Sequence, residues 1–265
     1  MYSFNYQKAK SVDEAAKIIA KDSDAKVLAG GQSLIAGMKL RLSKPSSVVD
    51  LGSIKGLSGI KVDSKAVTIG AMTRHAEVAA SSEARKAIPA LAALAGGIGD
   101  RMVRNMGTIG GSLANNDPAA DYPAGLLGLG ATVVTNKRKI AADDFIKGLY
   151  ETALGKGEII EQVSFPIPKR AAYMKFKNPA SRYAIVGVFV ADFGSSVRVA
   201  VTGAGPCAFR VASMEKALGA KFAPESVASI SVPEKGLNSD LHAKADYRAH
   251  LITVMARRAV EAAVK

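Results

Sequence analysis

Residues 28–34 read Leu28-Ala29-Gly30-Gly31-Gln32-Ser33-Leu34, between a short apolar segment, Lys26-Val27-Leu28, and an apolar run from Leu34 to Leu40. Consecutive glycines can adopt backbone angles that other residues avoid, so the stretch predicts a sharp turn at the end of a strand. Several N–H groups of such a turn can point into one concavity, which suits a phosphate oxygen. A Gly-Gly pair is commoner in an ordinary strand-to-helix connection, so the phosphate interpretation depends on further features of the chain.

The residues around this turn predict a small α/β unit. Ser11 and Glu14 fit a capping box at the start of a helix. Apolar residues from Val12 to Ile19 recur on one face of that helix. A second short strand is expected at Val48-Val49-Asp50-Leu51. We therefore place a first unit over residues 1–57.

A second glycine-rich stretch begins Gly107-Thr108-Ile109-Gly110-Gly111-Ser112 and reaches a carboxylate, Asp121, ten residues after Gly111. Glycines let the backbone approach a ligand closely, and Asp121 could accept hydrogen bonds from ribose hydroxyls. A flexible surface loop is the alternative interpretation. Neither glycine stretch fits the dinucleotide fingerprint G-x-G-x-x-G or the Gly-Lys-Ser/Thr of a P-loop.

The remaining sequence predicts an α+β protein. A hairpin, helices and strands of a second unit (58–168) are expected at Gly59–Val62, Ala66–Ile69, Pro89–Ile98, Pro123–Leu129, Ala131–Thr135 and Glu158–Phe165. Thr73 is expected to cap a helix running through Glu77. Pro166 and Pro168 mark the next boundary. The third unit (169–265) is expected to contain antiparallel strands and helices at Tyr173–Lys177, Ala184–Asp192, Val197–Thr202, Met214–Leu218 and Ala245–Val264.

Composition narrows the function. Cys207 is the only cysteine, whereas a cysteine-ligated iron–sulfur cluster needs about four thiolates. The histidines have no metal-ligand spacing, so no metal site is expected. The net charge is +13, but there is no tryptophan and the basic residues are dispersed, which argues against a nucleic-acid partner. No apolar run approaches the ~20 residues that span a bilayer, and no secretory signal opens the chain. We expect a cytoplasmic protein; a peripheral position at the inner face of the membrane is compatible with this expectation.

Four segments together resemble a known family. "AGGQSL" and "TIGGSLANNDPAAD" resemble the paired FAD motifs of the flavin subunits of molybdenum hydroxylases, which include carbon monoxide dehydrogenase and xanthine dehydrogenase. The resemblance continues through "KFKNPASRYAIVGV" and "VTGAGPCAFR" and spans nearly the whole chain. It implies a two-lobed FAD-binding domain of the PCMH type, followed by a C-terminal domain with an antiparallel sheet and helices. FAD would lie extended between the two lobes.

The resemblance also implies the residues that hold FAD. The pyrophosphate and nearby atoms would be wrapped by Lys26, Val27, Leu28, Ala29, Gly30, Gly31, Gln32, Ser33 and Leu34. The other side would be held by Thr108, Gly110, Gly111 and Ser112, and hydroxyls of the adenosine or ribityl portion by Asp121. Ile98 and Ile160 align with apolar positions that contact the cofactor, and Lys177 and Tyr183 with positions near the isoalloxazine ring. Gln32 departs from the histidine of several relatives.

These cofactor residues have alternative interpretations. Ile98 and Ile160 could be plain core residues, which is the commoner fate of isoleucine. Lys177 could be a solvated lysine on a strand, and Tyr183 a half-buried strand residue.

The function implied is electron transfer without substrate oxidation on this chain. A small partner with two [2Fe-2S] clusters would deliver electrons, FAD would collect them, and an external acceptor would receive them. A large partner would hold the molybdenum cofactor, and the complex would be a dimer of heterotrimers. The alternative is a free-standing FAD-dependent oxidoreductase, which needs its own acid–base residues. We expect no catalytic side chain here, because His75, His242 and His250 are scattered.

Overall fold

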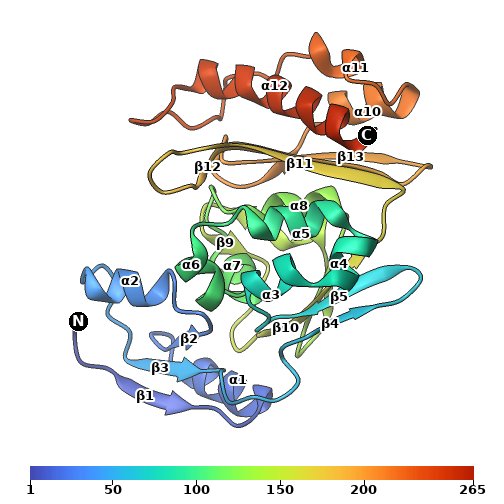
Figure 1. Ribbon diagram of the computed structural model, residues 1–265. Coiled ribbons are helices and arrows are strands. Elements are labelled where there is room, and N and C mark those ends of the chain that lie inside the picture. Colours follow the sequence, from blue (N-terminus) through green and yellow to red (C-terminus); the bar gives the residue numbers. More distant parts are fainter.

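Three β-sheets follow one another along the chain in the computed structural model, which describes residues 1–265 (Figure 1). The first sheet has three strands, the second five and the third four, and a separate two-stranded hairpin lies beside the second sheet. The helices of the middle segment lie between the second and third sheets, and the C-terminal helices cover the outer face of the third sheet. This order places the functional site where the first turn after a parallel strand meets the middle helices.

The N-terminal segment forms the α/β unit that the sequence predicts. Its elements are β1 (Asn5–Lys8), α1 (Val12–Lys21), β2 (Lys26–Leu28), α2 (Leu34–Lys39) and β3 (Ser47–Asp50). The strands are parallel in the order β1-β3-β2. The Ser11 hydroxyl accepts the Glu14 N–H at 3.1 Å, so the predicted N-cap is present. The Glu14 carboxylate accepts the N–H of Lys10 at 2.7 Å and not that of Ser11, so the reciprocal bond of a capping box is not formed. The carboxyl end of β2 delivers the chain into residues 29–33.

The middle segment surrounds an antiparallel sheet in the order β4-β5-β10-β6-β7. The strands of the middle segment are β4 (Ile60–Val62), β5 (Ala66–Gly70), β6 (Thr132–Thr135), β7 (Lys139–Ala141), β8 (Ile146–Gly148), β9 (Glu151–Thr152) and β10 (Ile160–Pro166), of which β8 and β9 form the separate hairpin. Its helices are α3 (His75–Ala80), α4 (Ser82–Ala87), α5 (Pro89–Gly96), α6 (Arg101–Met106), α7 (Ile109–Asn115), α8 (Tyr122–Gly128) and α9 (Ala142–Phe145). Strand β10 lies at the centre and pairs with both β5 and β6.

For this segment one local prediction was wrong, and one alternative interpretation does not hold. Helix α3 begins at His75, and Thr73 does not cap it: the Thr73 hydroxyl instead accepts the Gly59 N–H at 2.9 Å and donates to the Gly59 carbonyl at 3.1 Å. Residues 109–115 are a helix and not part of a flexible loop. Glycine disfavours an isolated helix, but tertiary packing overrides that preference. A Cβ at Gly110 would lie 2.6 Å from the Ala71 Cβ, so α7 approaches the end of β5 as only glycine permits.

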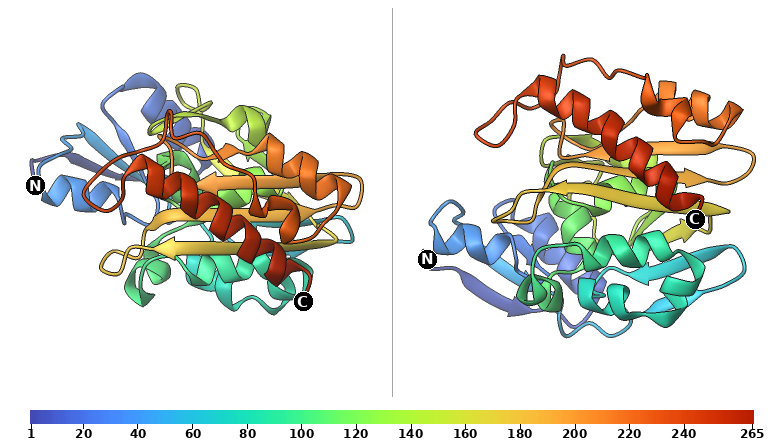
Figure 2. Two further views of the ribbon diagram at one scale, coloured as in Figure 1. Left: turned by 90° about the horizontal axis from the view of Figure 1, so that it is seen from above. Right: turned by 45° about the horizontal axis from the view of Figure 1, so that its top comes forward.

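The C-terminal segment forms an antiparallel sheet in the order β11-β12-β13-β14. Its elements are β11 (Arg170–Lys177), β12 (Ala184–Asp192), β13 (Val197–Thr202), β14 (Phe209–Arg210), α10 (Ala212–Ala220), α11 (Glu225–Ala228) and α12 (Ala245–Ala263). All nine residues of β12 are buried because both faces are covered. Val188 belongs to the core under α12, whereas its neighbour Phe189 belongs to the core of the middle segment. Figure 2 shows α12 crossing this sheet. None of the helices, α12 included, has the length and apolar character to cross a bilayer.

Candidate functional site

A cavity of about 750 Å³ opens where the two glycine stretches meet. The turn after β2, helix α7 and the loop at residues 181–183 all contribute to its wall. The N-terminal, middle and C-terminal segments therefore all contribute residues to its lining. This size lies in the upper part of the range of small-molecule sites, roughly 300–1,000 Å³.

The turn after β2 offers backbone donors that no group in the chain uses. The N–H groups of Gly30, Gly31, Gln32 and Ser33 make no hydrogen bond within the chain, and all four residues line the cavity. Gly31 has a φ of 73°, a left-handed conformation that favours glycine. Unpaired backbone donors are costly unless water or a ligand satisfies them, and successive ones form an anion-binding concavity.

Close backbone packing holds this turn in place. A Cβ on Gly30 would lie 2.7 Å from the Gly107 Cα and closer still to the Met106 carbonyl oxygen. The two glycine stretches, nearly eighty residues apart, are therefore in direct backbone contact. Gly30 is required here by its contact with the second stretch, whereas Gly31 is favoured by the conformation of the turn.

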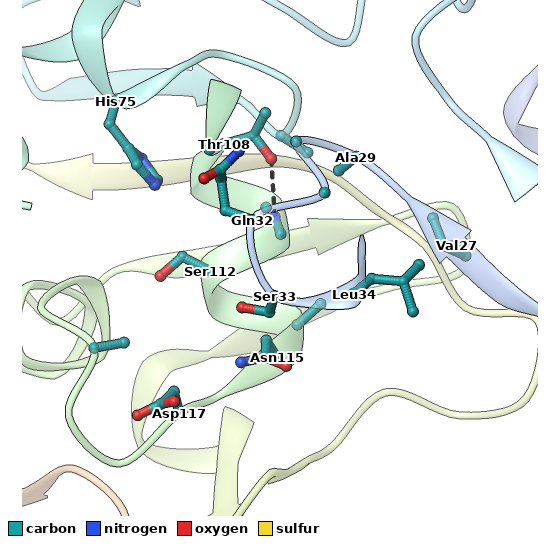
Figure 3. Close-up of a pocket in the computed structure, with 18 of the residues that line it drawn as sticks. Val27, Ala29, Gln32, Ser33, Leu34, His75, Thr108, Ser112, Asn115 and Asp117 are labelled. Carbon is teal, nitrogen blue, oxygen red and sulfur yellow. Dashed lines mark hydrogen bonds between the residues drawn. The ribbon is translucent and has the colours of Figure 1, made fainter. Parts of the chain in front are cut away.

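Helix α7 presents polar side chains to the cavity, whereas its first backbone N–H groups are already hydrogen-bonded within the chain. The N–H groups of Ile109, Gly110 and Gly111 are taken by Thr73 O (3.1 Å), Ala71 O (2.8 Å) and the Thr108 hydroxyl (3.2 Å). Figure 3 shows instead that the polar ends of Ser112, Ser33 and Asp117 point to the same side of the cavity. The amides of the first turn and the hydroxyls and carboxylate of the second stretch thus complement each other.

A buried ionic network lies at the inner wall of the cavity. Asp121 is 4% exposed, and its carboxylate accepts the Tyr173 phenol on one oxygen and Lys175 Nζ, at 2.8 Å, on the other. Lys175 Nζ also donates to the Gly97 carbonyl at 3.1 Å. Burial raises the pKa of the Asp121 carboxyl, and the neighbouring Lys175 opposes that shift. A carboxylate has roughly four acceptor positions, so Asp121 keeps free lone pairs for ligand hydroxyls.

Comparison with known proteins identifies this type of site. Residues 2–168 match the family described as the FAD binding domain in molybdopterin dehydrogenase. The chain belongs to this FAD-binding family. It is 36% identical to the nicotine 6-hydroxylase medium subunit of Paenarthrobacter nicotinovorans, over 97% of this chain and 96% of that subunit. It is 35% identical to the carbon monoxide dehydrogenase medium chain of Hydrogenophaga pseudoflava, over 98% and 96% of the two chains.

Solved structures agree. The structure of carbon monoxide dehydrogenase from Hydrogenophaga pseudoflava that lacks the Mo-pyranopterin moiety contains a chain similar to this one, with a TM-score of 0.89 and 34% identity. The match covers 99% of this chain and 98% of that chain. The predicted fold class and family are therefore confirmed: the protein is an FAD-binding subunit of the molybdenum hydroxylase type and a component of an oxidoreductase.

The cavity of this FAD-binding subunit fits its cofactor. Four unpaired N–H groups suit a diphosphate, hydroxyl and carboxylate groups beside them suit sugar or ribityl hydroxyls, and Ile98 and Ile160 supply apolar wall. All the cofactor residues expected from the sequence line the cavity except Leu28 and Lys177. Leu28 lies outside the lining, and its Cδ1 is 3.2 Å from the position that a Cβ on Gly31 would take.

The structure does not place Lys177 in the cavity wall, and its expected place near the isoalloxazine ring stays a prediction. Lys177 is exposed at the end of β11 and lies outside the cavity lining, whereas the buried lysine beside the cavity is Lys175. Residues two apart in a regular strand share a face. They also lie about 7 Å apart along the strand, and Lys175 is the one whose ammonium group reaches Asp121 and the Gly97 carbonyl.

The sequence interpretation missed His75, Tyr150 and Asp117 in the cavity wall. The three histidines were set aside because they are scattered along the sequence. His75 is 5% exposed, its Nδ1 has no hydrogen-bond partner, and its ring lies 5.3 Å from that of Tyr122. Burial lowers the pKa of His75 to about 4, and nearby Arg104 contributes to the shift. His75 is therefore neutral at pH 7 and can act there only as an uncharged polar group.

This shift predicts a pH-dependent stability. Because the folded-state pKa of His75 (about 4) lies below the unfolded value of 6.5, the unfolded state binds the proton first as pH falls. Neutral His75 therefore contributes about 3 kcal/mol to the free energy of unfolding. This contribution is complete above pH 6.5 and is lost as the pH falls from 6.5 to 4. Urea unfolding at pH 7 and pH 4 should show this loss in wild type and not in His75→Leu. An equal loss in both would rule His75 out as the cause.

Proposed function

We propose that this chain accepts electrons from an iron–sulfur partner subunit onto FAD held in the cavity, and passes them to an external acceptor. The observation that carries the proposal is the row of four unpaired N–H groups from Gly30 to Ser33 beside the polar side chains of α7. Bound FAD would supply the redox chemistry, taking up two electrons and releasing them. The single cysteine cannot ligate a cluster alone, so the electrons would arrive from another chain.

The chain's own residues would bind and orient the cofactor. The amides of residues 30–33 would hold the diphosphate, and Asp121, fixed by Lys175 and Tyr173, would accept hydrogen bonds from hydroxyls. Since no acid–base pair in the cavity is poised on a substrate position, we assign no catalytic residue to this chain. The relatives are named medium subunits or chains, which supports partner subunits. We propose a small [2Fe-2S] subunit and a large molybdenum-cofactor subunit, assembled as a dimer of heterotrimers in the cytoplasm.

We also propose the division into units 1–57, 58–168 and 169–265. No sheet crosses a boundary: the first and third ranges each contain one complete sheet, and the second contains the five-stranded sheet and the β8-β9 hairpin, which supports the division. The second and third units share a core, because Phe189 and Ala191 of β12 pack with α8 and α5 residues. A Cβ on Gly128 of α8 would lie 2.7 Å from the Phe189 ring. We therefore expect these two units to unfold together.

A charge placed in the amide row should block the cofactor. Ser33 is exposed in the turn, so Ser33→Asp can present a carboxylate to the donors that would hold the diphosphate. Competition and repulsion should weaken FAD binding by about 3 kcal/mol, roughly a hundredfold. Ser33→Asn is the neutral control of the same shape and should bind within a few-fold of wild type. The measurement is an FAD titration of each full-length chain, after a check that the free energy of unfolding is unchanged.

The electron route is tested in the assembled complex. Co-expression with the partner subunits and removal of unbound cofactor should leave flavin absorbance near ~450 nm in wild type and not in Ser33→Asp. In the Ser33→Asp complex, substrate should still reduce the iron–sulfur clusters while turnover with the acceptor is lost. Unimpaired turnover without flavin would contradict the proposal. Oxidation of a small substrate by the isolated chain would favour a free-standing oxidoreductase.

A further inference from the structure

The hairpin of β8 and β9 carries an unexplained aromatic residue at the cavity. Tyr150 lies between the two strands, is 57% exposed and lines the cavity. Its φ is 54°, a left-handed conformation that is strained for a bulky residue. An exposed aromatic side chain gains little from burial, so packing does not account for a tyrosine at a position that favours glycine.

The second glycine stretch holds this hairpin in place. Asn116, the buried residue after α7, donates from Nδ2 to the carbonyls of Gly148 (2.8 Å) and Glu151 (2.9 Å). The next residue, Asp117, accepts the Tyr150 hydroxyl on Oδ2 at 3.2 Å. The hydrogen bonds on both sides of Tyr150 therefore start from the segment that also forms the cavity wall, and they fix the tyrosine beside it.

A second tyrosine reaches the same opening from the third sheet. Tyr183 lines the cavity, is 47% exposed and follows a turn in which the Asn178 side chain accepts the N–H groups of Ala180 and Ser181. Burial raises the pKa of both phenols; Asp117 raises both further, and Tyr183 contributes to the shift at Tyr150. Both rings are therefore neutral at pH 7 and lie near the same carboxylate.

We propose that Tyr150 is a further cofactor-binding residue, whose ring and that of Tyr183 enclose the isoalloxazine ring at the mouth of the cavity. The proposal rests on the proposed function, since it requires FAD in this cavity. Aromatic rings favour stacked or edge contacts with other planar rings. Strained backbone persists where the surrounding structure enforces it and clusters at ligand sites, which matches the hydrogen bonds from Asn116 and Asp117.

The test compares Tyr150→Gly, Tyr150→Phe and Leu149→Ala in the full-length chain. Leu149 is the matched control, because it is equally exposed at 57% and does not line the cavity. Tyr150→Gly should raise the Kd for FAD roughly tenfold or more, by loss of one stacking contact. Bound flavin should fluoresce more strongly in this variant, because a stacked tyrosine quenches it. The melting temperature without FAD should not fall, since glycine tolerates the backbone angle. Tyr150→Phe and Leu149→Ala should bind FAD as wild type does.

Several outcomes would overturn this assignment. If Tyr150→Gly bound FAD with the affinity of wild type, the Tyr150 ring would not contact the cofactor. Equal losses in Tyr150→Gly and Tyr150→Phe would assign the effect to the hydroxyl and Asp117 instead. A lowered melting temperature in Tyr150→Gly would indicate a structural role. Loss of ADP binding with unchanged FMN binding would place the ring at the adenine end. If Ser33→Asp also leaves FAD affinity unchanged, the proposed function fails rather than the role of Tyr150.

Discussion

Replacement of Lys175 by methionine will lower the free energy of unfolding by about 3–5 kcal/mol, whereas the same change at Lys177 will have almost no effect. Lys175 is the only cationic partner of the Asp121 carboxylate, which is buried beside the cavity. Removing one partner of a buried ion pair leaves the other charge uncompensated, and that desolvation cost is the origin of the loss. Lys177 is exposed and outside the cavity, so its charge is screened by water.

Urea unfolding of the two variants at pH 7 measures this difference. The double variant Lys175→Met/Asp121→Asn should recover part of the lost stability, because it removes the uncompensated charge. FAD affinity should also fall in Lys175→Met, since Asp121 would no longer be fixed toward the cavity. Equal stability in Lys175→Met and Lys177→Met would show that the buried pair is not formed in solution.

Substitution of Gly30 by alanine will disrupt the junction of the two glycine stretches, with a loss of about 4 kcal/mol or more and no measurable FAD binding. The added Cβ would meet the Met106 carbonyl and the Gly107 Cα, which are backbone atoms that cannot rotate away. The turn would have to move off α6 and α7, so the row of unpaired amides would leave its position.

Gly219 is the matched control for this substitution. A Cβ at Gly219 of α10 meets nothing within 4 Å, so Gly219→Ala should be neutral or stabilise the chain by about 0.5–1 kcal/mol. Thermal unfolding of both variants, with FAD titration of each, measures the effects. A Gly30→Ala variant that folds and binds FAD normally would contradict the close contact between the two stretches.

Much of the secondary structure could be predicted because its signals are local. Ser11 and Glu14 marked the start of α1, and the limits of β12 and β13 coincide with the apolar runs at Ala184–Asp192 and Val197–Thr202. The residues expected at the cofactor could be named from the motif resemblance, and nearly all of them line one cavity. These predictions depend on residues that are neighbours in the sequence.

The features that could not be predicted depend on contacts between distant residues. Helix α7 forms in a glycine-rich segment because Ala71 and Thr73 take its first N–H groups. Asp121 finds its partners, Tyr173 and Lys175, more than fifty residues away in β11. His75 carries no local sequence signal, and its role follows only from its burial in the cavity wall.

A crystal structure of the FAD-loaded protein tests the central claim most directly, because it locates the diphosphate relative to the amides of residues 30–33. We predict diphosphate oxygens within hydrogen-bond distance, roughly 2.7–3.2 Å, of several of the N–H groups from Gly30 to Ser33. A diphosphate bound elsewhere, with these N–H groups hydrogen-bonded only to water, would contradict it.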